Sequence, residues 1–354
     1  MCTSPQGMNL EGFLFDYFNT PDVALRKWWR IGLTLQDYSQ LYKNRVIDDM
    51  LEIMSSPSPQ ILYEAMRYSA QAGGKLLRPL LTLISSEAVG GSVMQAMPAA
   101  VAIELVHDFS LVHDDIMDND DLRRGRPTVH KKWNVNVAIL AGDAVLVKAY
   151  QALSQVEDRH LMQVLKEFNE GILRVCEGQM MDMDFESRND VSLDEYFAMI
   201  ERKTGKLFSL ACELGAILGG GGETEIQALK KFGAKIGRAF QIQDDLLDLS
   251  ADEAVLGKDV GSDLYQDKKT FLMLYSREHA DEEQKKRLLK LLGNPGAGVK
   301  AVLALFEEIG VVQAAQLEIH HALDDARSAV DIVQHNNAKS ALVELIDFVD
   351  QREF

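Results

Sequence analysis

Hydrophobic residues recur along this chain at the spacing of an α-helix. Val46, Met50 and Met54 lie four residues apart. Ile47 and Leu51 widen the same apolar stripe, which is typical of a helix with one buried face. Similar patterns predict further helices over residues 95–118, 138–154, 161–181, 205–218, 225–248, 298–309 and 313–334. Strand-like alternation is scarce, so we predict an all-α fold.

Turn-forming residues separate the predicted helices. We expect breaks at Ser55–Pro59, Gly90–Ser92, Arg124–Pro127, Gly219–Gly222 and Gly293–Gly298. No linker rich in Pro, Ser and Gly divides the middle of the chain, and some predicted helices are apolar on every face. Both observations favour a single-domain bundle of many helices, with the most apolar helices at its centre.

Residues 1–40 are interpreted as an N-terminal extension, which leaves residues 41–354 as the main domain. The extension is rich in aromatic residues, namely Phe13, Phe15, Phe18, Trp28 and Trp29. We expect it to pack onto the body of the protein or onto a partner subunit. Contact with a membrane surface is the alternative.

Composition narrows the range of functions. The 354 residues include 37 Lys and Arg against 54 Asp and Glu, a net charge of -17, which argues against a nucleic-acid partner. Cys2, Cys176 and Cys212 show no C-x-x-C spacing and fit a reduced, cytoplasmic protein. Neither a signal peptide nor an uninterrupted apolar stretch of about 20 residues is evident, so we expect no transmembrane segment.

Two acidic clusters interrupt apolar helical sequence. Asp114 and Asp118 lie four residues apart and therefore share one helix face, as do Asp244 and Asp248. Two such faces brought together repel each other unless cations lie between them. Mg²⁺ is typically held by one or two carboxylates together with substrate phosphates. The clusters therefore predict a magnesium-dependent diphosphate site.

Basic residues beside Gly or Pro supply the charge that an anionic substrate requires. They occur as GGKLLRP at residues 73–79, RRGRP at 123–127, KTGK at 203–206, KDVGSD at 258–263 and KKT at 268–270. Arg binds phosphate as a planar fork and Lys as a point charge. One such cluster would be an ordinary surface charge, but the clusters together indicate phosphate binding.

The order of these motifs resembles that of the trans-isoprenyl diphosphate synthases of the polyprenyl synthetase family, from about Lys43 to the C-terminus. The resemblance rests on GGKLLRP, DDLRRGRPT, AGDA at 141–144, GQMMD at 178–182, KTGKLF, FQIQDDLLD and GKDVGSDLYQDKKT. It implies the isoprenoid synthase fold, a helical bundle around a central active-site cavity. KTG stands where many members have KTA. One additional residue between Lys258 and Lys268 leaves Lys269 as an alternative to Lys268.

The resemblance also implies a role for each matched residue. The diphosphate of isopentenyl diphosphate would be bound by Lys75, Arg78, His107 and Arg124. Mg²⁺, expected as three ions once substrate is bound, would be ligated by Asp114, Asp118 and Asp244. The allylic diphosphate would be clamped by Arg123, Lys203, Lys258 and Lys268. Thr204 and Gln241 would lie near the developing carbocation and complete the catalytic set with Lys203 and Arg123. Indirect roles, through water or other side chains, would fall to Asp115 and Asp248.

The implied reaction joins isopentenyl diphosphate to dimethylallyl, geranyl or farnesyl diphosphate by ionisation, condensation and elimination. Phe109 and Ser110 precede the first acidic cluster, where side-chain size sets product length in the family, and they indicate a geranylgeranyl product. A farnesyl or a longer polyprenyl product is the alternative. The family also implies a homodimer.

Three other classes of protein remain to be weighed. A class I terpene cyclase would lack the basic set and would carry a different second acidic motif. A non-catalytic subunit of a heteromeric synthase would usually lose one acidic cluster, whereas both are intact here. A generic acidic helical scaffold would show no Mg²⁺-dependent turnover.

Overall fold

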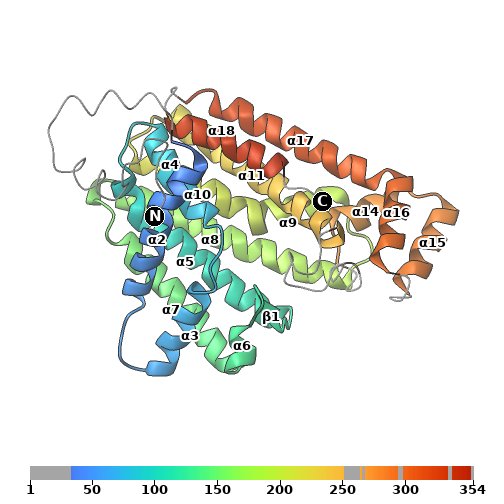
Figure 1. Cartoon of the computed structure of the whole chain (residues 1–354), viewed down its shortest axis with the longest axis horizontal. Helices are drawn as coiled ribbons and strands as arrows, with labels where there is room; N and C mark the ends of the chain where they lie inside the picture. The colour runs from blue at the N-terminus through green and yellow to red at the C-terminus, as the bar shows by residue number, and fades with distance from the viewer. Residues whose placement is uncertain (1–32, 251–263, 265–267, 294–297, 334–336, 352–354) are drawn as a thin grey trace, which may run out of the picture.

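The computed structural model describes residues 33–250, 264, 268–293, 298–333 and 337–351 (Figure 1). The first helices are α2 (Leu35–Ile53), α3 (Gln60–Ala70), α4 (Leu77–Ala88) and α5 (Val93–Met117). A hairpin of β1 (Leu122–Arg123) and β2 (Arg126–Pro127) precedes α6 (Val129–Lys132), α7 (Val135–Leu153), α8 (Asp158–Ser187) and α9 (Leu193–Ile200). A short π-helix, η2 (Glu201–Gly205), leads into α10 (Lys206–Leu218) and α11 (Glu223–Ser250). The last helices are α14 (Phe271–His279), α15 (Glu282–Leu292), α16 (Val299–Ile309), α17 (Val311–Val330) and α18 (Asn337–Asp350).

Helix α10 lies at the centre of the bundle. Every residue from Leu207 to Leu218 is buried, and the helix packs against α4, α8 and α11. Helix α5 packs against α4 and α7, and α11 packs against α17 (Figure 1). The predicted all-α bundle with its most apolar helices at the centre is therefore confirmed. Of the predicted N-terminal extension, residues 1–32, with Phe13, Phe15, Phe18, Trp28 and Trp29, lie outside the described residues, and α2 begins within the extension at Leu35.

Local sequence signals explain the start and the buried face of α2. The Asp37 carboxylate accepts a hydrogen bond from the Thr34 backbone N–H at 2.8 Å, and the Thr34 hydroxyl accepts one from the Asp37 backbone N–H at 3.1 Å. This capping box satisfies N–H groups that the first helical turn leaves free. The predicted stripe of Val46, Met50 and Met54 is buried, which confirms it.

Several boundaries differ from the sequence prediction by a few residues, most of all the ends of α8 and α17. Helix α8 spans 158–187 rather than 161–181, because its polar ends carry no apolar stripe, and α17 ends at Val330 rather than 334. The break expected at Arg124–Pro127 is part of a β-hairpin. Arg124 and Gly125 have φ angles of 52° and 72°, which is the backbone of a type I′ turn.

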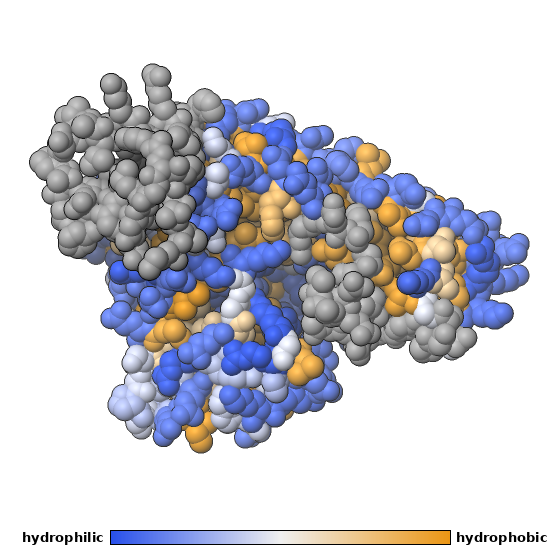
Figure 2. All heavy atoms as spheres, in the orientation of Figure 1, coloured by the Kyte–Doolittle hydropathy of each residue, from blue (hydrophilic) through white to orange (hydrophobic). Residues whose placement is uncertain are grey.

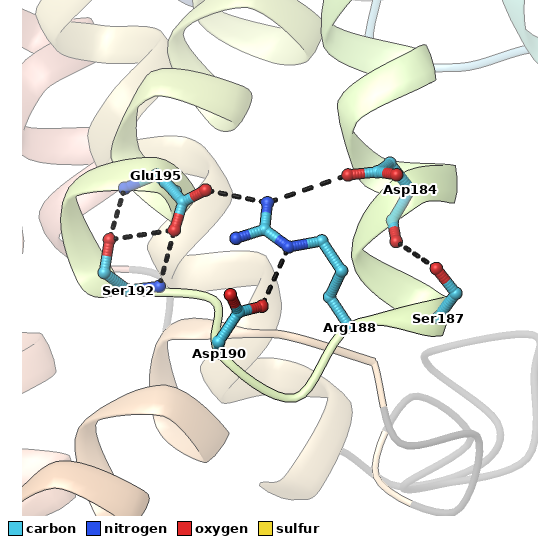
Figure 3. A network of polar contacts seen from close by, with 6 residues as sticks. All are labelled: Asp184, Ser187, Arg188, Asp190, Ser192 and Glu195. Atoms are coloured by element: carbon cyan, nitrogen blue, oxygen red, sulfur yellow. Dashed lines mark hydrogen bonds and ion pairs between the residues drawn. The ribbon is translucent and has the colours of Figure 1, made fainter.

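A polar network fixes the turn between α8 and α9 (Figure 3). The Arg188 guanidinium donates hydrogen bonds to Asp190 at 2.9 Å and to Glu195 at 2.8 Å, and it forms an ion pair with Asp184 at 3.6 Å. These hydrogen bonds lower the pKa of both Asp190 and Glu195. Ser192 caps the start of α9. The network thus sets where α9 begins, and α9 runs directly into η2.

Helix α7 is the one described helix whose length and composition would also suit a membrane span. In this structure 33% of that stretch is buried, and the helix packs against α5 and α3. Core helices meet the same criterion, so length and composition are weak evidence for a membrane here.

Candidate active site

A cavity of about 410 Å³ lies between α4, α5, the β-hairpin, η2, α10 and α11. Most residues predicted for the site line it, namely Lys75, Arg78, His107, Ser110, Asp114, Arg123, Arg124, Lys203, Thr204, Gln241 and Asp244. Figure 2 shows a hollow near the middle of the molecule, edged largely by hydrophilic residues. Segments that are distant in the sequence therefore form one charged cavity.

The acidic part of the cavity comes from the C-terminal end of α5 and from α11. Asp114 and Asp244 are partly exposed and line the cavity. Asp118 ends α5, and its carboxylate lies 3.5 Å from the Lys268 ammonium. Burial raises the pKa of Asp114 against the opposing charge of Lys203, and Asp118 raises it further. The negative end of the α5 dipole adds to the repulsion between the Asp114 and Asp118 carboxylates, so the site favours a cation.

The second carboxylate of the first acidic cluster points to a different partner. Asp115 is 4% exposed and accepts a hydrogen bond from Arg123 Nε at 2.5 Å. Burial raises its pKa to about 6, against the opposing effect of Arg123. Asp248 is also buried and does not line the cavity. These placements fit the indirect roles predicted for both residues, which stay predictions.

The basic part of the cavity is built on the first turn of α4. Arg78 stacks over the Phe208 ring at 4.4 Å, and its Nη1 lies 3.1 Å from His107 Nε2. Because arginine can only donate, His107 Nε2 accepts this hydrogen bond. Burial and the charge of Arg78 hold the pKa of His107 well below its usual value. His107 therefore faces the cavity as a neutral imidazole.

The β-hairpin brings its arginines against the same turn. The Arg124 guanidinium packs on Gly74 so closely that an added Cβ at Gly74 would lie 2.9 Å from Arg124 Nη2. Gly74 also has a φ of 150°, which favours glycine. Arg124 itself has a positive φ, a conformation that costs a non-glycine residue energy and recurs at functional sites.

The π-helix η2 carries Lys203 and Thr204 to the cavity. Helix α8 approaches it so closely that a Cβ at Gly178 would lie 2.3 Å from the Lys203 backbone nitrogen. Lys203 Nζ donates to the Asp182 carboxylate at 2.5 Å. Burial alone would lower the pKa of Lys203, but Asp182 and Asp114 outweigh it, so the pKa is raised. Thr204 donates to Gln241 Oε1 at 2.7 Å.

Three acidic residues of this region were missed as site residues. Asp182 lies in the GQMMD motif, four residues after Gly178, and its position within that motif is the signal that could have found it. Glu104 and Asp108 lie one turn apart on α5 and are buried near Arg124. Their signal is the presence of acids inside an apolar helical run.

Four predicted positions are not among the residues that line this cavity. Asp118 and Lys268, which lie 3.5 Å apart, do not line it, although Lys268 lines a neighbouring cavity with Lys203 and Gln241. Lys258 falls outside the described residues. Ser110 lines the cavity, but Phe109 does not; its ring packs edge-on against His113 with centroids 4.8 Å apart. The predicted influence of Phe109 and Ser110 on product length stays a prediction.

The carboxylates fit Mg²⁺ when a diphosphate completes its coordination. Among the described residues, no group of three or more His, Cys, Asp and Glu side chains lies close enough to hold a metal alone. Mg²⁺ commonly binds one or two carboxylates plus phosphate oxygens, so no closed protein cage is needed. The fold and the cavity are those of an all-α enzyme that handles diphosphates.

Comparison with known proteins identifies the family. The profile of the polyprenyl synthetase family matches residues 59–309. A short chain isoprenyl diphosphate synthase of Methanothermobacter thermautotrophicus is 40% identical over 321 residues, 90% of this chain and 98% of that protein. A geranylgeranyl diphosphate synthase of Methanosarcina mazei is 37% identical over 91% of this chain and 99% of that protein. The crystal structure of geranylgeranyl pyrophosphate synthetase from Pyrococcus horikoshii has a TM-score of 0.85 and 41% identity, over 90% of this chain and 98% of that chain.

The chain therefore belongs to the polyprenyl synthetase family. The predicted isoprenoid synthase fold and the predicted class of enzyme, a trans-prenyltransferase, are confirmed. The individual roles of the site residues stay predictions, because these comparisons do not test them.

Proposed function

We propose that this protein condenses isopentenyl diphosphate with an allylic diphosphate in a Mg²⁺-dependent reaction and mainly produces geranylgeranyl diphosphate. One observation carries the proposal. Carboxylates from two helices, cations from several segments and an uncharged Thr–Gln pair line one cavity. This combination suits a reaction in which diphosphate leaves and a carbocation forms.

We assign the diphosphate of isopentenyl diphosphate to Lys75, Arg78 and Arg124. Lys75 lies 4.8 Å from the centre of the Phe348 ring of α18, and Arg78 lies over Phe208, so apolar surfaces support both side chains. Such support reduces the entropy lost when a flexible cation binds phosphate. Neutral His107, whose Nε2 accepts from Arg78, keeps its other ring nitrogen as a donor.

Ionisation occurs at the allylic diphosphate. Its C–O bond breaks, the electron pair leaves with the diphosphate, and an allylic cation remains. Lys203, Arg123 and Lys268 stabilise the charge that collects on the leaving group. Asp114, Asp118 and Asp244 would hold Mg²⁺, expected as three ions with substrate bound, which would supply further positive charge at this group.

Condensation follows in the apolar part of the cavity. The double bond of isopentenyl diphosphate attacks the cation, and the proton lost afterwards passes to the released diphosphate. Thr204 and Gln241 lie beside the cation in this arrangement. Leu207, Phe208 and Phe240 also line the cavity and exclude water that would otherwise capture the cation.

The small side chain of Ser110, which lines the cavity, supports a product of intermediate length. A farnesyl or longer product is the alternative. The test is purified protein with isopentenyl diphosphate and each of the three allylic diphosphates, with and without Mg²⁺, and product length measured by mass spectrometry. We expect geranylgeranyl diphosphate. A cyclic hydrocarbon would indicate a terpene cyclase, and absence of product would indicate a non-catalytic subunit.

The same assay tests the predicted role of Phe109. We expect Phe109→Ala to lengthen the product, because removal of the ring would open space beside Ser110. An unchanged product distribution would show that Phe109 is ordinary core packing against His113.

We further propose a homodimer that forms through α7 and α8. Exposed apolar side chains repeat along both helices, namely Val135, Ile139, Leu140 and Val147 on α7 and Met162, Leu173, Met180 and Met183 on α8. Leu140 and Leu173 are 61% and 54% exposed, and a continuous exposed apolar surface typically marks an interface. We expect Leu140→Glu to shift the mass in multi-angle light scattering toward a monomer, whereas Leu289→Glu on α15 should leave it unchanged.

A cytoplasmic location accompanies this proposal. Cys176 and Cys212, the two described cysteines, are free thiols, and burial raises the pKa of Cys212 to about 12. Free thiols fit a reducing compartment. Fractionation of cells that express the tagged chain would test the location.

A further inference from the structure

Asp245, the second carboxylate of the second acidic cluster, lies at a junction of three helices. It is 6% exposed. Its Oδ2 accepts hydrogen bonds from the Tyr196 hydroxyl of α9 at 2.7 Å and from the Phe271 backbone N–H of α14 at 3.1 Å. Its Oδ1 accepts from Gln241 Nε2, one turn earlier on α11, at 3.1 Å. Three donors therefore converge on one carboxylate.

This arrangement determines the orientation of the Gln241 amide. A carboxylate can only accept, so the NH₂ group of Gln241 must face Asp245 and its carbonyl oxygen must face the other way. That oxygen accepts the Thr204 hydroxyl hydrogen at 2.7 Å. The lone pairs of the Thr204 oxygen then point away from that hydrogen and are available to the cavity, which Thr204 lines.

The polarity of this chain of hydrogen bonds suits a cationic intermediate. An oxygen whose hydrogen points away presents the negative end of its dipole, and fixed dipoles of this kind stabilise developing positive charge without reorganisation. If the Gln241 amide rotated, its NH₂ group would face Thr204 and the Thr204 hydroxyl would have to turn. The Thr204 hydroxyl hydrogen, which is the positive end of the O–H dipole, would then face the cavity.

We infer that Asp245 is a positioning residue that orients Gln241, and through it Thr204, toward the allylic cation, rather than a ligand of Mg²⁺. The inference rests on the proposed function, since it presumes that a cation forms beside Thr204. It also separates the roles within the acidic cluster. Asp244 lines the cavity, whereas both oxygens of Asp245 already accept hydrogen bonds from protein donors.

The contact with Phe271 also positions the start of α14, next to the basic segment at residues 268–270. Phe271 is the first residue of α14 and follows Lys268, Lys269 and Thr270 directly. Lys268 lies 3.5 Å from Asp118 of the first acidic cluster. Asp245 therefore holds the start of α14, which follows this basic segment, by the same carboxylate that orients Gln241.

Asp245→Asn tests the inference, because the amide keeps the shape but introduces a donor beside Gln241. We expect kcat to fall about 10- to 100-fold, the usual range when a supporting hydrogen-bond partner is lost. The Mg²⁺ concentration that gives half-maximal rate should stay within about twofold of the wild type, because no metal ligand is removed. Asp244→Asn, in contrast, should raise that Mg²⁺ concentration.

A double-mutant cycle with Gln241→Ala separates positioning from metal binding and from general structure. If Asp245 acts through Gln241, Asp245→Asn should cost less than about threefold in the Gln241→Ala background, because coupled residues are not additive. Tyr196→Phe, which removes one donor but leaves the carboxylate, should give a smaller fall in kcat with the same Mg²⁺ dependence. This variant also keeps the test available if Asp245→Asn does not fold.

Two results would overturn the inference. One is a fall in kcat from Asp245→Asn that is as large in the Gln241→Ala background as in the wild type. The other is a shift of the Mg²⁺ requirement as large as that of Asp244→Asn. If the wild-type protein forms no prenyl product with Mg²⁺, the proposed function fails instead, and the two failures are thus distinguishable.

Discussion

The two acidic clusters have the same sequence form but different surroundings. In each, the first carboxylate lines the cavity and the second is buried. Asp115 in the first cluster binds the charged Arg123 of the β-hairpin, whereas Asp245 in the second accepts from the uncharged Tyr196 and Gln241. Consecutive residues on a helix point about 100° apart, so the split between first and second carboxylates follows from the helix itself.

The nature of the partner follows from position in the fold. The first cluster ends α5, where the connection to the next element brings a basic hairpin beside it. The second cluster lies within α11, between α9 and α14, where packed helices offer hydroxyl, amide and backbone donors. The described contacts therefore join Asp115 to the guanidinium of Arg123 and Asp245 to hydroxyl, amide and backbone donors.

The largest expected effect comes from the first carboxylate of each cluster. Asp114→Asn and Asp244→Asn keep the size of the side chain but remove its charge. We expect each to lower kcat/KM by about a thousandfold and to raise the Mg²⁺ requirement, because each removes a proposed metal ligand. Initial rates across a Mg²⁺ series would measure this, with the exposed Asp331→Asn on the surface as control. A wild-type rate in either variant would show that the two clusters do not share one metal site.

Removal of the Arg123 side chain tests the contact with Asp115 that is particular to the first cluster. Arg123→Ala leaves the carboxylate of Asp115 buried without this cation. We expect about 3 kcal/mol of lost stability in urea unfolding. We also expect about a hundredfold fall in kcat/KM for the allylic substrate, since a cation proposed to bind its diphosphate is lost. Arg159→Ala is the control, because its ion pair with Glu157 is exposed on both sides and exposed pairs contribute little. Equal losses in both variants would contradict the special role of the Asp115–Arg123 pair.

A smaller change moves the hairpin without removing a charge. In Gly74→Ala the new methyl group would collide with the Arg124 guanidinium, because its carbon would lie 2.9 Å from Arg124 Nη2. We expect the KM for isopentenyl diphosphate to rise about tenfold, because displacement of a positioning group by a fraction of an ångström is costly. Gly73→Ala is the control: it also strains a positive φ, but nothing lies within 4 Å of its Cβ. A similar KM in both variants would assign the effect to backbone strain.

The smallest effect concerns stability and pH on the helix of the first cluster. Burial, with the nearby charge of Glu104, raises the pKa of Asp108 to about 8, and its Oδ2 has no hydrogen-bond partner among the described residues. Because the pKa is higher in the folded state than in the unfolded chain, stability should fall as the pH rises from about 4 to 8. Asp108→Asn should flatten this dependence and raise the Tm by a few degrees at pH ~8.5, with little change at pH ~5. An unchanged slope of Tm against pH would contradict the raised pKa.

Much of this organisation could be predicted from the sequence. Apolar spacing located the helices, and the acidic and basic motifs named most residues that line the cavity. The ends of α8 were missed because polar helical turns carry no apolar period. The influence of Phe109 on product length was predicted from its place before the first acidic cluster and stays a prediction, and the structure adds that its ring packs on His113. Sequence distance from a motif does not determine which neighbour a side chain meets.

The sequence by itself determined the all-α class and the two acidic clusters. It also determined that the first carboxylate of each cluster shares a helix face with the carboxylate four residues later, since these features depend on local spacing. The tertiary structure alone decided the partners. Tyr196 and Phe271 donate hydrogen bonds to Asp245 from 49 and 26 residues away. The Arg124 guanidinium of the β-hairpin packs on Gly74, just before α4. The physical reason is that a buried polar group must find hydrogen-bond partners, and packing of distant helices decides which partners are within reach.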